Sequence, residues 1–168
     1  SLGGVIKSIL VQTGNTVKKG QVIASITNNS FITLQEEFLS VSSKAEFAQL
    51  EFVRQKELQQ GNASALKNLQ TAEVELKILK VKKASLQKQL ELIGINTETL
   101  TSENIQAVVS ITSPISGAIS NVMVNIGSYV DANNPIAEIV DNSQLHLDLY
   151  VYEKDLRKIK VGQTIHFT

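Results

Sequence analysis

The sequence predicts an α+β protein in which two small β units fold onto each other and a long helical hairpin projects from between them. One motif occurs twice without gaps, as GVIKSILVQTGNTVKKGQVIASITNNS at 4–30 and GAISNVMVNIGSYVDANNPIAEIVDNS at 117–143. Both copies group their apolar residues in short runs broken by turn residues, which is typical of strands. The block at 31–94 has the composition and apolar spacing of paired helices.

Composition restricts the class of function. The 168 residues carry 16 basic and 16 acidic side chains, so no net charge attracts nucleic acid. Cysteine is absent, which excludes thiolate chemistry and disulfides. No stretch approaches the roughly 20 apolar residues that span a bilayer, and the N-terminus lacks a signal-peptide pattern. The chain begins and ends in strand-like runs, so we expect it to be a fragment.

The two β units have matching turns. In the first unit, the run VIKSILV leads to a turn at Gly14, and the strand VIASI follows a turn at Gly20. Gly14 and its equivalent Gly127 suit turn positions that need a positive φ. Asn133 replaces Gly20 in the second copy, where asparagine also tolerates the left-handed region. The second copy therefore keeps the first copy's succession of strand-like runs and turns.

Two helices are expected between the units. The range from Phe31 to Gln60 has no proline or glycine, and its apolar residues alternate four- and three-residue spacing, the pattern of a coiled-coil seam. A second helix follows Gly61 and Asn62, and Gly94 is expected to end it in a left-handed cap. The first helix is net acidic and the second is rich in lysine, which favours their pairing. The seam residues are Leu34, Phe38, Val41, Ala45, Ala48 and Phe52, then Leu69, Ala72, Leu76, Leu79, Lys83, Leu86, Leu90 and Ile93.

A chain reversal at Gly61 to Ser64 makes these helices antiparallel. Several of the expected layers match a large with a small residue, which fills a seam evenly. Lys83 is the exception, and we expect its amine to extend into water. At about 1.5 Å per residue, helices of roughly 30 residues make an arm about 45 Å long. The layers join Phe52 with Ala72, Ala48 with Leu76, Ala45 with Leu79, Val41 with Lys83, Phe38 with Leu86, Leu34 with Leu90, and Phe31 with Ile93.

A second apolar set occupies helical positions that point away from the partner helix. A two-helix arm in water normally keeps such a surface polar. We interpret these residues as outer edges that pack against neighbouring hairpins or a partner, although scattered exposed apolar side chains are also common. The set comprises Phe47, Leu50 and Val53 on the first helix and Val74, Ile78 and Val81 on the second.

The runs GNTVKKGQVI and GSYVDANNPI resemble the lipoyl/biotinyl half-motif. The resemblance implies a lipoyl-like β-sandwich or flattened barrel, built from residues 1–30 and 107–143. Carrier proteins of that family present a lysine for lipoate or biotin after the motif. The aligned positions here are Ser30 and Ser143, which offer no amine. No cofactor is therefore expected.

The order of half-motif, helical hairpin, half-motif and strand-rich segment resembles that of periplasmic adaptor proteins, or membrane fusion proteins. The segment SPISGAISNVMVNIGSYVDANNPIAEIVDNSQLHLDLYVYEKDLRKIKVGQTIHF looks like the adaptors of resistance-nodulation-division pumps, particularly the heavy-metal efflux branch. The resemblance implies a hairpin at 31–94, a connecting loop at 95–106 and the start of a β-barrel domain at 144–168, with a short helix from Glu153 to Lys158 and a turn at Gly162.

This resemblance also implies a function. It describes a non-catalytic periplasmic subunit that links an inner-membrane pump to an outer-membrane channel and self-associates into a ring. Metal ions or small toxic compounds would be exported, and segments outside this chain would anchor it to the inner membrane. The alternatives are an adaptor of an ABC exporter or type I secretion system and, from another class, a lipoyl or biotinyl carrier domain of an acyl-transfer enzyme.

At the hairpin tip, the adaptor family often carries the pattern R-x-x-x-L-x-x-x-x-x-x-S, which contacts the outer-membrane channel. Arg54 and Leu58 match its first two positions. Ala65 occupies the serine position, and Ser64 stands one place early. These four residues are the candidate channel contacts. The alternative is that Arg54 is a surface helix residue and Ser64 caps the second helix.

No metal site, nucleic-acid site or catalytic centre is expected. The only histidines are His146 and His166, which we interpret as strand residues, and Met123 is the only methionine. No histidine, cysteine or paired-carboxylate arrangement has spacing suited to catalysis. The lysines of the second helix lack interleaved aromatic residues, so they indicate a solvated face.

Overall fold

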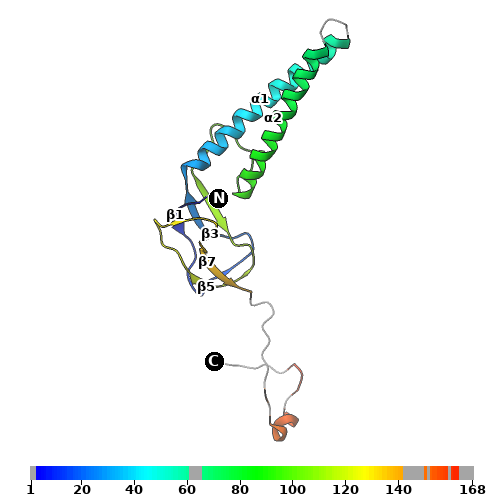
Figure 1. Ribbon diagram of the computed structural model, residues 1–168. Helices are drawn as coiled ribbons and strands as arrows, with labels where there is room; N and C mark the ends of the chain where they lie inside the picture. Colours follow the sequence, from blue (N-terminus) through cyan, green and yellow to red (C-terminus); the bar gives the residue numbers. More distant parts are fainter. Residues whose placement is uncertain (1–2, 61–65, 142–149, 151, 159, 163–168) are drawn as a thin grey trace.

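The computed structural model describes residues 3–60, 66–141, 150, 152–158 and 160–162. It consists of a compact β unit from which two long helices project side by side (Figure 1). The α+β class is therefore confirmed. The elements are β1 (Gly4–Ile9), β2 (Thr16–Val17), β3 (Val22–Thr27), α1 (Asn29–Gln60), α2 (Leu66–Leu92), β4 (Val108–Thr112), β5 (Gly117–Val122), β6 (Tyr129–Val130), β7 (Ala137–Val140) and the 3-10 helix η1 (Glu153–Lys158).

Strands from the two sequence copies interlock. One sheet has the order β4-β3-β1-β6 and the other has the order β2-β5-β7. β6 of the second copy therefore pairs with β1 of the first, and β2 of the first copy pairs with β5 of the second. Neither copy completes its sheet alone, which confirms that the two units fold onto each other.

The predicted turns are present in both copies. Gly14 and Gly127 both have a φ of 89°, in the region that favours glycine. The N–H of Gly14 donates to the carbonyl oxygen of Ile119 at 2.8 Å, and that of Gly127 donates to the carbonyl oxygen of Ile6 at 2.9 Å. Each turn thus hydrogen-bonds to the opposite copy, so the turns also hold the two units together.

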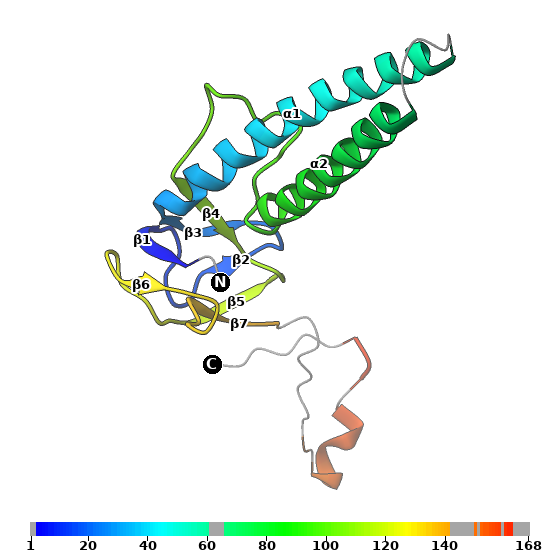
Figure 2. The ribbon, with the colours of Figure 1, turned by 45° about the horizontal axis from the view of Figure 1, so that its top comes forward.

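The hairpin shares a hydrophobic core with the β unit. One buried cluster lies within the β unit and contains Val11, Val17, Ile23 and Ile119. A second cluster joins the β unit to the bases of α1 and α2, which rise from the side that carries β3 and β4 (Figure 2). This core fixes the arm to the sheets. Its buried members are Ile6, Ile26, Phe31, Phe38, Val41, Leu86, Leu90, Ile95, Val109 and Val130.

The end of α2 has the expected cap. Gly94 has a φ of 79°. Its N–H donates to the carbonyl oxygen of Glu91, and the N–H of Ile95 donates to that of Leu90, both at 3.0 Å. This is the Schellman arrangement, which satisfies the last carbonyls of the helix and turns the chain back.

The helical seam largely follows the predicted pattern. Phe38, Val41, Ala45, Ala48, Ala72, Leu76, Leu86 and Leu90 are buried, whereas Leu34, Phe52, Leu69, Leu79 and Ile93 are half-buried. The predicted charge complementarity is also present, because Lys82 Nζ lies 2.6 Å from Glu37 Oε1 across the helices. Lys83 is half-buried, and its amine lies 5.9 Å from the centre of the Phe38 ring, within range of a cation–π contact.

The described C-terminal residues include the expected short helix, which is η1, and Gly162, which has a φ of 90° in a turn. Ser64, Ala65, Ser143, His146 and His166 lie outside the described residues. So do most positions of the strands expected on either side of η1, and the proposed domain boundaries stay predictions. Among the described helices, none is long and apolar enough to cross a membrane.

Candidate functional site

Arg54 and Leu58 lie on the last two turns of α1, at the end of the arm farthest from the β unit (Figure 1). Residues four apart on a helix share one face, so the structure brings these two side chains together. Both are exposed, and the Arg54 guanidinium pairs with the Glu51 carboxylate on the preceding turn. An exposed pair of this kind is readily exchanged for another partner, because surface ion pairs contribute only about 0–1 kcal/mol.

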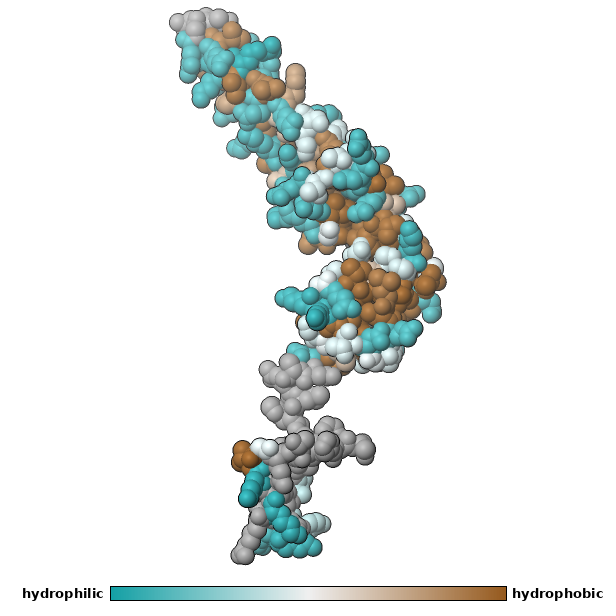
Figure 3. Space-filling model, turned by 180° about the vertical axis from the view of Figure 1, so that it is seen from behind, coloured by the Kyte–Doolittle hydropathy of each residue, from teal (hydrophilic) through white to brown (hydrophobic). Residues whose placement is uncertain are grey.

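The six residues of the outer edges are all exposed, with between 43% and 70% of each accessible. They occupy both helices over the part of the arm between the tip and the base. Seen from behind, apolar surface alternates with hydrophilic surface along the arm (Figure 3). The prediction that these side chains point away from the seam is therefore confirmed, whereas their packing against a neighbour stays a prediction.

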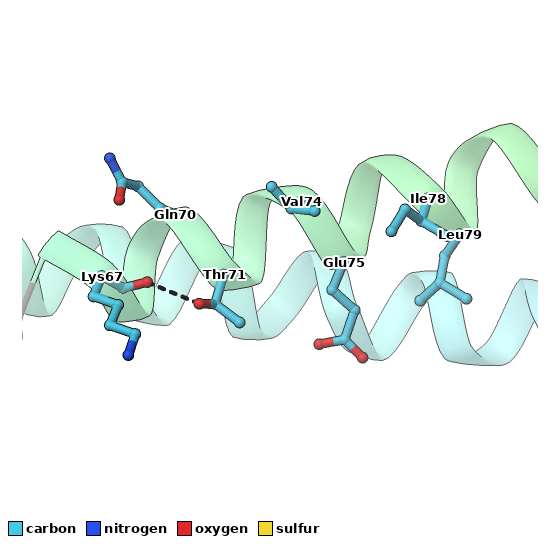
Figure 4. Close-up of a pocket in the computed structure, with 7 residues that line it drawn as sticks. All are labelled: Lys67, Gln70, Thr71, Val74, Glu75, Ile78 and Leu79. Atoms are coloured by element: carbon cyan, nitrogen blue, oxygen red, sulfur yellow. Dashed lines mark hydrogen bonds between the residues drawn. The ribbon is translucent and has the colours of Figure 1, made fainter.

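A shallow groove runs along α2 beside this edge. Val74, Ile78 and Gln70 lie along one side of it, and Thr71, Glu75 and Leu79 lie along the other (Figure 4). The Thr71 hydroxyl donates to the Lys67 carbonyl oxygen at 2.9 Å, so its proton already has an acceptor within α2. Three apolar side chains, Val74, Ile78 and Leu79, line the groove together with polar and charged ones, which suits contact with another partly apolar surface.

A second groove continues from the first across the arm to α1. It is lined by Ser43, Lys44 and Phe47 of α1 and by Glu75 and Leu79 of α2, of which the last two also line the first groove. Phe47 is therefore level with the part of α2 that carries Ile78. The outer edges of the two helices thus lie at similar heights along the arm.

Two polar residues that the sequence analysis missed hold the arm on the β unit. Asn28 precedes α1 and its side-chain oxygen accepts from the backbone N–H of Ser30 at 2.8 Å, as an N-cap residue does. Gln35 is fully buried. Its Nε2 donates to the carbonyl oxygens of Phe31 at 2.6 Å and Gln106 at 2.8 Å, and its Oε1 accepts from the Gln106 N–H at 3.2 Å. An asparagine just before a helix is a recognisable N-cap residue, so the role of Asn28 could have been predicted from the sequence. The burial of Gln35 could not, because the spacing of apolar residues does not indicate where a polar side chain is buried.

Ser30, the residue aligned with the lysine of carrier proteins, lies in the first turn of α1. Its hydroxyl donates to the Asn28 side-chain oxygen at 2.8 Å. The chain after β3 thus enters a helix instead of an exposed β-turn, and the position offers a hydroxyl that already has a partner. This arrangement does not favour a lipoyl or biotinyl carrier.

Two interlocked β units with a helical hairpin inserted between them define a barrel-sandwich hybrid carrying a coiled-coil arm. The model of the family described as CzcB-like, barrel-sandwich hybrid domain matches residues 1–141. The chain belongs to this family.

Individual relatives agree with this assignment. The cobalt-zinc-cadmium resistance protein CzcB of Cupriavidus metallidurans is 24% identical over 162 residues, covering 96% of this chain and 30% of CzcB. The crystal structure of ZneB from Cupriavidus metallidurans is similar over 96% of this chain and 66% of the ZneB chain, with a TM-score of 0.58 at 23% identity. The structure of the membrane fusion protein Spr0693 from Streptococcus pneumoniae R6 is similar over 95% of this chain and 66% of the Spr0693 chain, with a TM-score of 0.54 at 20% identity. The structural likenesses show the fold, and the chain spans less than a third of the length of CzcB.

Proposed function

We propose that this chain is part of a non-catalytic periplasmic adaptor that links an inner-membrane pump of the resistance-nodulation-division type to an outer-membrane channel. The observation that carries the proposal is the arm itself. The 32 residues of α1 make a rod of about 48 Å at 1.5 Å per residue. Such a rod separates its tip from the β unit by a distance suited to bridging two partners. The full protein would be anchored to the inner membrane through segments outside this chain.

The apolar outer edges support self-association of the adaptor into a ring. Each arm has one apolar edge on α1 and another on α2, at similar heights. Copies placed side by side, all with their tips at the same end, therefore bring the α1 edge of one against the α2 edge of the next. Such head-to-tail contacts close into a ring when the rotation between copies permits.

Metal ions or small toxic compounds are the proposed cargo. The metal-resistance name of CzcB favours metal ions. An adaptor of an ABC exporter or type I secretion system is the competing function. Loss of metal tolerance after deletion of the gene, restored by the intact gene, would support the metal pump. Unchanged tolerance together with capture of an ATP-hydrolysing membrane protein would favour the exporter.

The docking of the tip is tested by photo-crosslinking in cells that contain the full-length protein. A photoreactive residue at Leu58 should capture an outer-membrane channel protein. Leu92 provides the matched control, because it is an exposed leucine at the base of the same hairpin. Capture of the channel from Leu92 but not from Leu58 would mean that the tip points elsewhere. The same substitution at Ser64 and Ala65 extends the test across the tip motif.

A further inference from the structure

The sheet that carries the arm is open at both of its edges. It has the order β4-β3-β1-β6, and no strand among the described residues pairs with the outer side of β4 or of β6. Natural proteins protect such edges with charges, bulges or a covering segment. Neither edge is charged here, because the sequence has no acidic or basic residue from Asn104 to Val130, the range that contains both strands. The two edges are thus available for pairing with another strand.

One row of residues crosses the whole sheet and joins these edges at the same level. Val108 of β4 pairs with Thr27 of β3. Thr27 pairs in turn with Val5 of β1, and Val5 pairs with Tyr129 of β6. Val108 and Tyr129 therefore end the row on opposite edges. A neighbouring copy at the same height and in the same orientation would place its own row in line with this one.

The backbone of Val108 directs its hydrogen-bonding groups away from the sheet. In an antiparallel ladder, opposed residues alternate between pairs that exchange two hydrogen bonds and pairs that exchange none. The Asn28 N–H donates to the Ala107 carbonyl oxygen at 3.0 Å, so the adjoining pair, Val108 with Thr27, exchanges none. The N–H and C=O of Val108 therefore face the open side of β4.

Tyr129 has the same phase at the other edge. The Ile6 N–H donates to the Ser128 carbonyl oxygen at 2.9 Å, so the adjoining pair, Val5 with Tyr129, exchanges no hydrogen bond. The N–H and C=O of Tyr129 therefore face the open side of β6. Each end of the row thus offers one donor and one acceptor, which is what a hydrogen-bonded antiparallel pair requires.

A cleft beside β4 leaves room for a further strand. All five residues of β4 line this cleft of about 600 Å³, together with Glu91–Ile95 at the end of α2. Gln106 lies two residues before Val108 and therefore has the same phase. Its N–H and C=O are already bonded to the Gln35 side chain of the same copy. The open part of the edge is therefore β4 itself.

We propose that β4 of one copy pairs with β6 of the next, so that the sheet continues from copy to copy and Val108 exchanges two backbone hydrogen bonds with Tyr129 of its neighbour. β4 is antiparallel to β3, β3 to β1, and β1 to β6. β4 and β6 of one copy therefore run in opposite directions. Two copies in the same orientation thus bring these edges together as an antiparallel pair, so the partner is a second copy of this chain.

This contact fits the proposed ring, on whose self-association it rests. The cleft beside β4 adjoins the end of α2, and Figure 2 shows β6 on the opposite side of the β unit, toward α1. Pairing of β6 with β4 of the next copy therefore brings the α1 side of one arm to the α2 side of the next, with both tips at the same end. A contact between two different edges is heterologous, and such contacts close into a ring when the rotation permits.

Cysteine crosslinking tests the pairing. The 168 residues contain no cysteine, so Val108→Cys and Tyr129→Cys place single thiols at the two edges. In a hydrogen-bonded antiparallel pair the Cα atoms lie about 5.5 Å apart, within the range that a disulfide spans. The two variants of the full-length protein, produced together in cells, should form a disulfide-linked dimer on oxidation, and neither variant alone should. Leu10→Cys replaces Tyr129→Cys in the control, which should give no dimer, because both residues are 62% exposed but Leu10 lies outside the row.

Hydrogen exchange provides a second test that needs no substitution. On assembly of the full-length protein, the amides of Val108 and Tyr129 should exchange at least about tenfold more slowly, since both acquire an acceptor. The Val5 amide is the internal control, because it faces β3 within the same row and is paired in both states.

The outcomes separate this contact from the ring itself, whose formation is followed by the mass of the assembled complex. A complete assembly with neither the crosslink nor the amide protection would overturn the pairing of β4 with β6 and leave the proposed ring intact. A dimer from Val108→Cys alone would mean that β4 pairs with β4 of a second copy, with the arms pointing in opposite directions, which also overturns the proposal. Absence of any assembly would overturn both the ring and this contact.

Discussion

Gln35 fixes the connecting loop to the arm through one amide side chain. It is the only residue of α1 that is both polar and buried among those the structure describes, and each of its polar atoms has a partner. The loop residues Thr97, Leu100 and Ser102 line a cavity with Leu39 and Ser42 of α1, so the loop returns along the helix before it enters β4. Figure 2 shows this segment beside α1. This contact therefore joins the loop to the arm beside the hydrophobic core that fixes the arm to the sheets.

Replacement of Gln35 by leucine should lower stability by about 1–3 kcal/mol, because the N–H and carbonyl of Gln106 lose their partners in a part-buried contact and the Gln35 amide is removed from the core. The measurement is the free energy of unfolding in urea. Gln70→Leu is the control, since Gln70 is an exposed glutamine on α2. Equal losses for the two variants would mean that the hydrogen bonds of Gln35 are dispensable.

At the scale of the elements, the apolar spacing predicted most of the seam because a coiled coil repeats its own contacts along its length. Gln35 and the loop at 95–106 were not predictable in this way, since the loop has no periodicity and its position depends on tertiary contacts. The repeat predicted two equivalent β units. It did not indicate that β6 pairs with β1 and β2 with β5, because equivalence alone does not distinguish pairing within a copy from pairing between copies.

The seam makes a graded prediction for two leucines of α2. Leu86 is buried, whereas Leu79 is half-buried beside the two grooves. Leu86→Ala should therefore cost about 2–5 kcal/mol, and Leu79→Ala clearly less, because less apolar surface returns to water. Urea denaturation of each variant measures the difference. A larger loss at Leu79 would contradict the burial pattern of the seam.

At the scale of the whole molecule, the apolar outer edges are the surfaces through which neighbouring copies would meet in the proposed ring. Phe47 and Ile78 belong to opposite helices and line adjoining grooves that share Glu75 and Leu79. In the proposed ring, Phe47 of one copy lies near Ile78 of the next. A charge placed at either position would be desolvated against an apolar neighbour, which is costly unless an opposite charge meets it.

Phe47→Glu and Ile78→Lys should each weaken assembly of the full-length protein, and a mixture of the two variants should restore it. In an alternating ring, half of the contacts would join Glu at position 47 to Lys at position 78, and the other half would remain wild type. The mass of the assembled complex is the measurement. Glu46→Lys, a charge change at an exposed neighbouring position, is the control and should leave assembly intact. If the mixture assembles no better than either variant alone, the α1 and α2 edges do not meet between copies, and the ring must form through the β unit or through other domains.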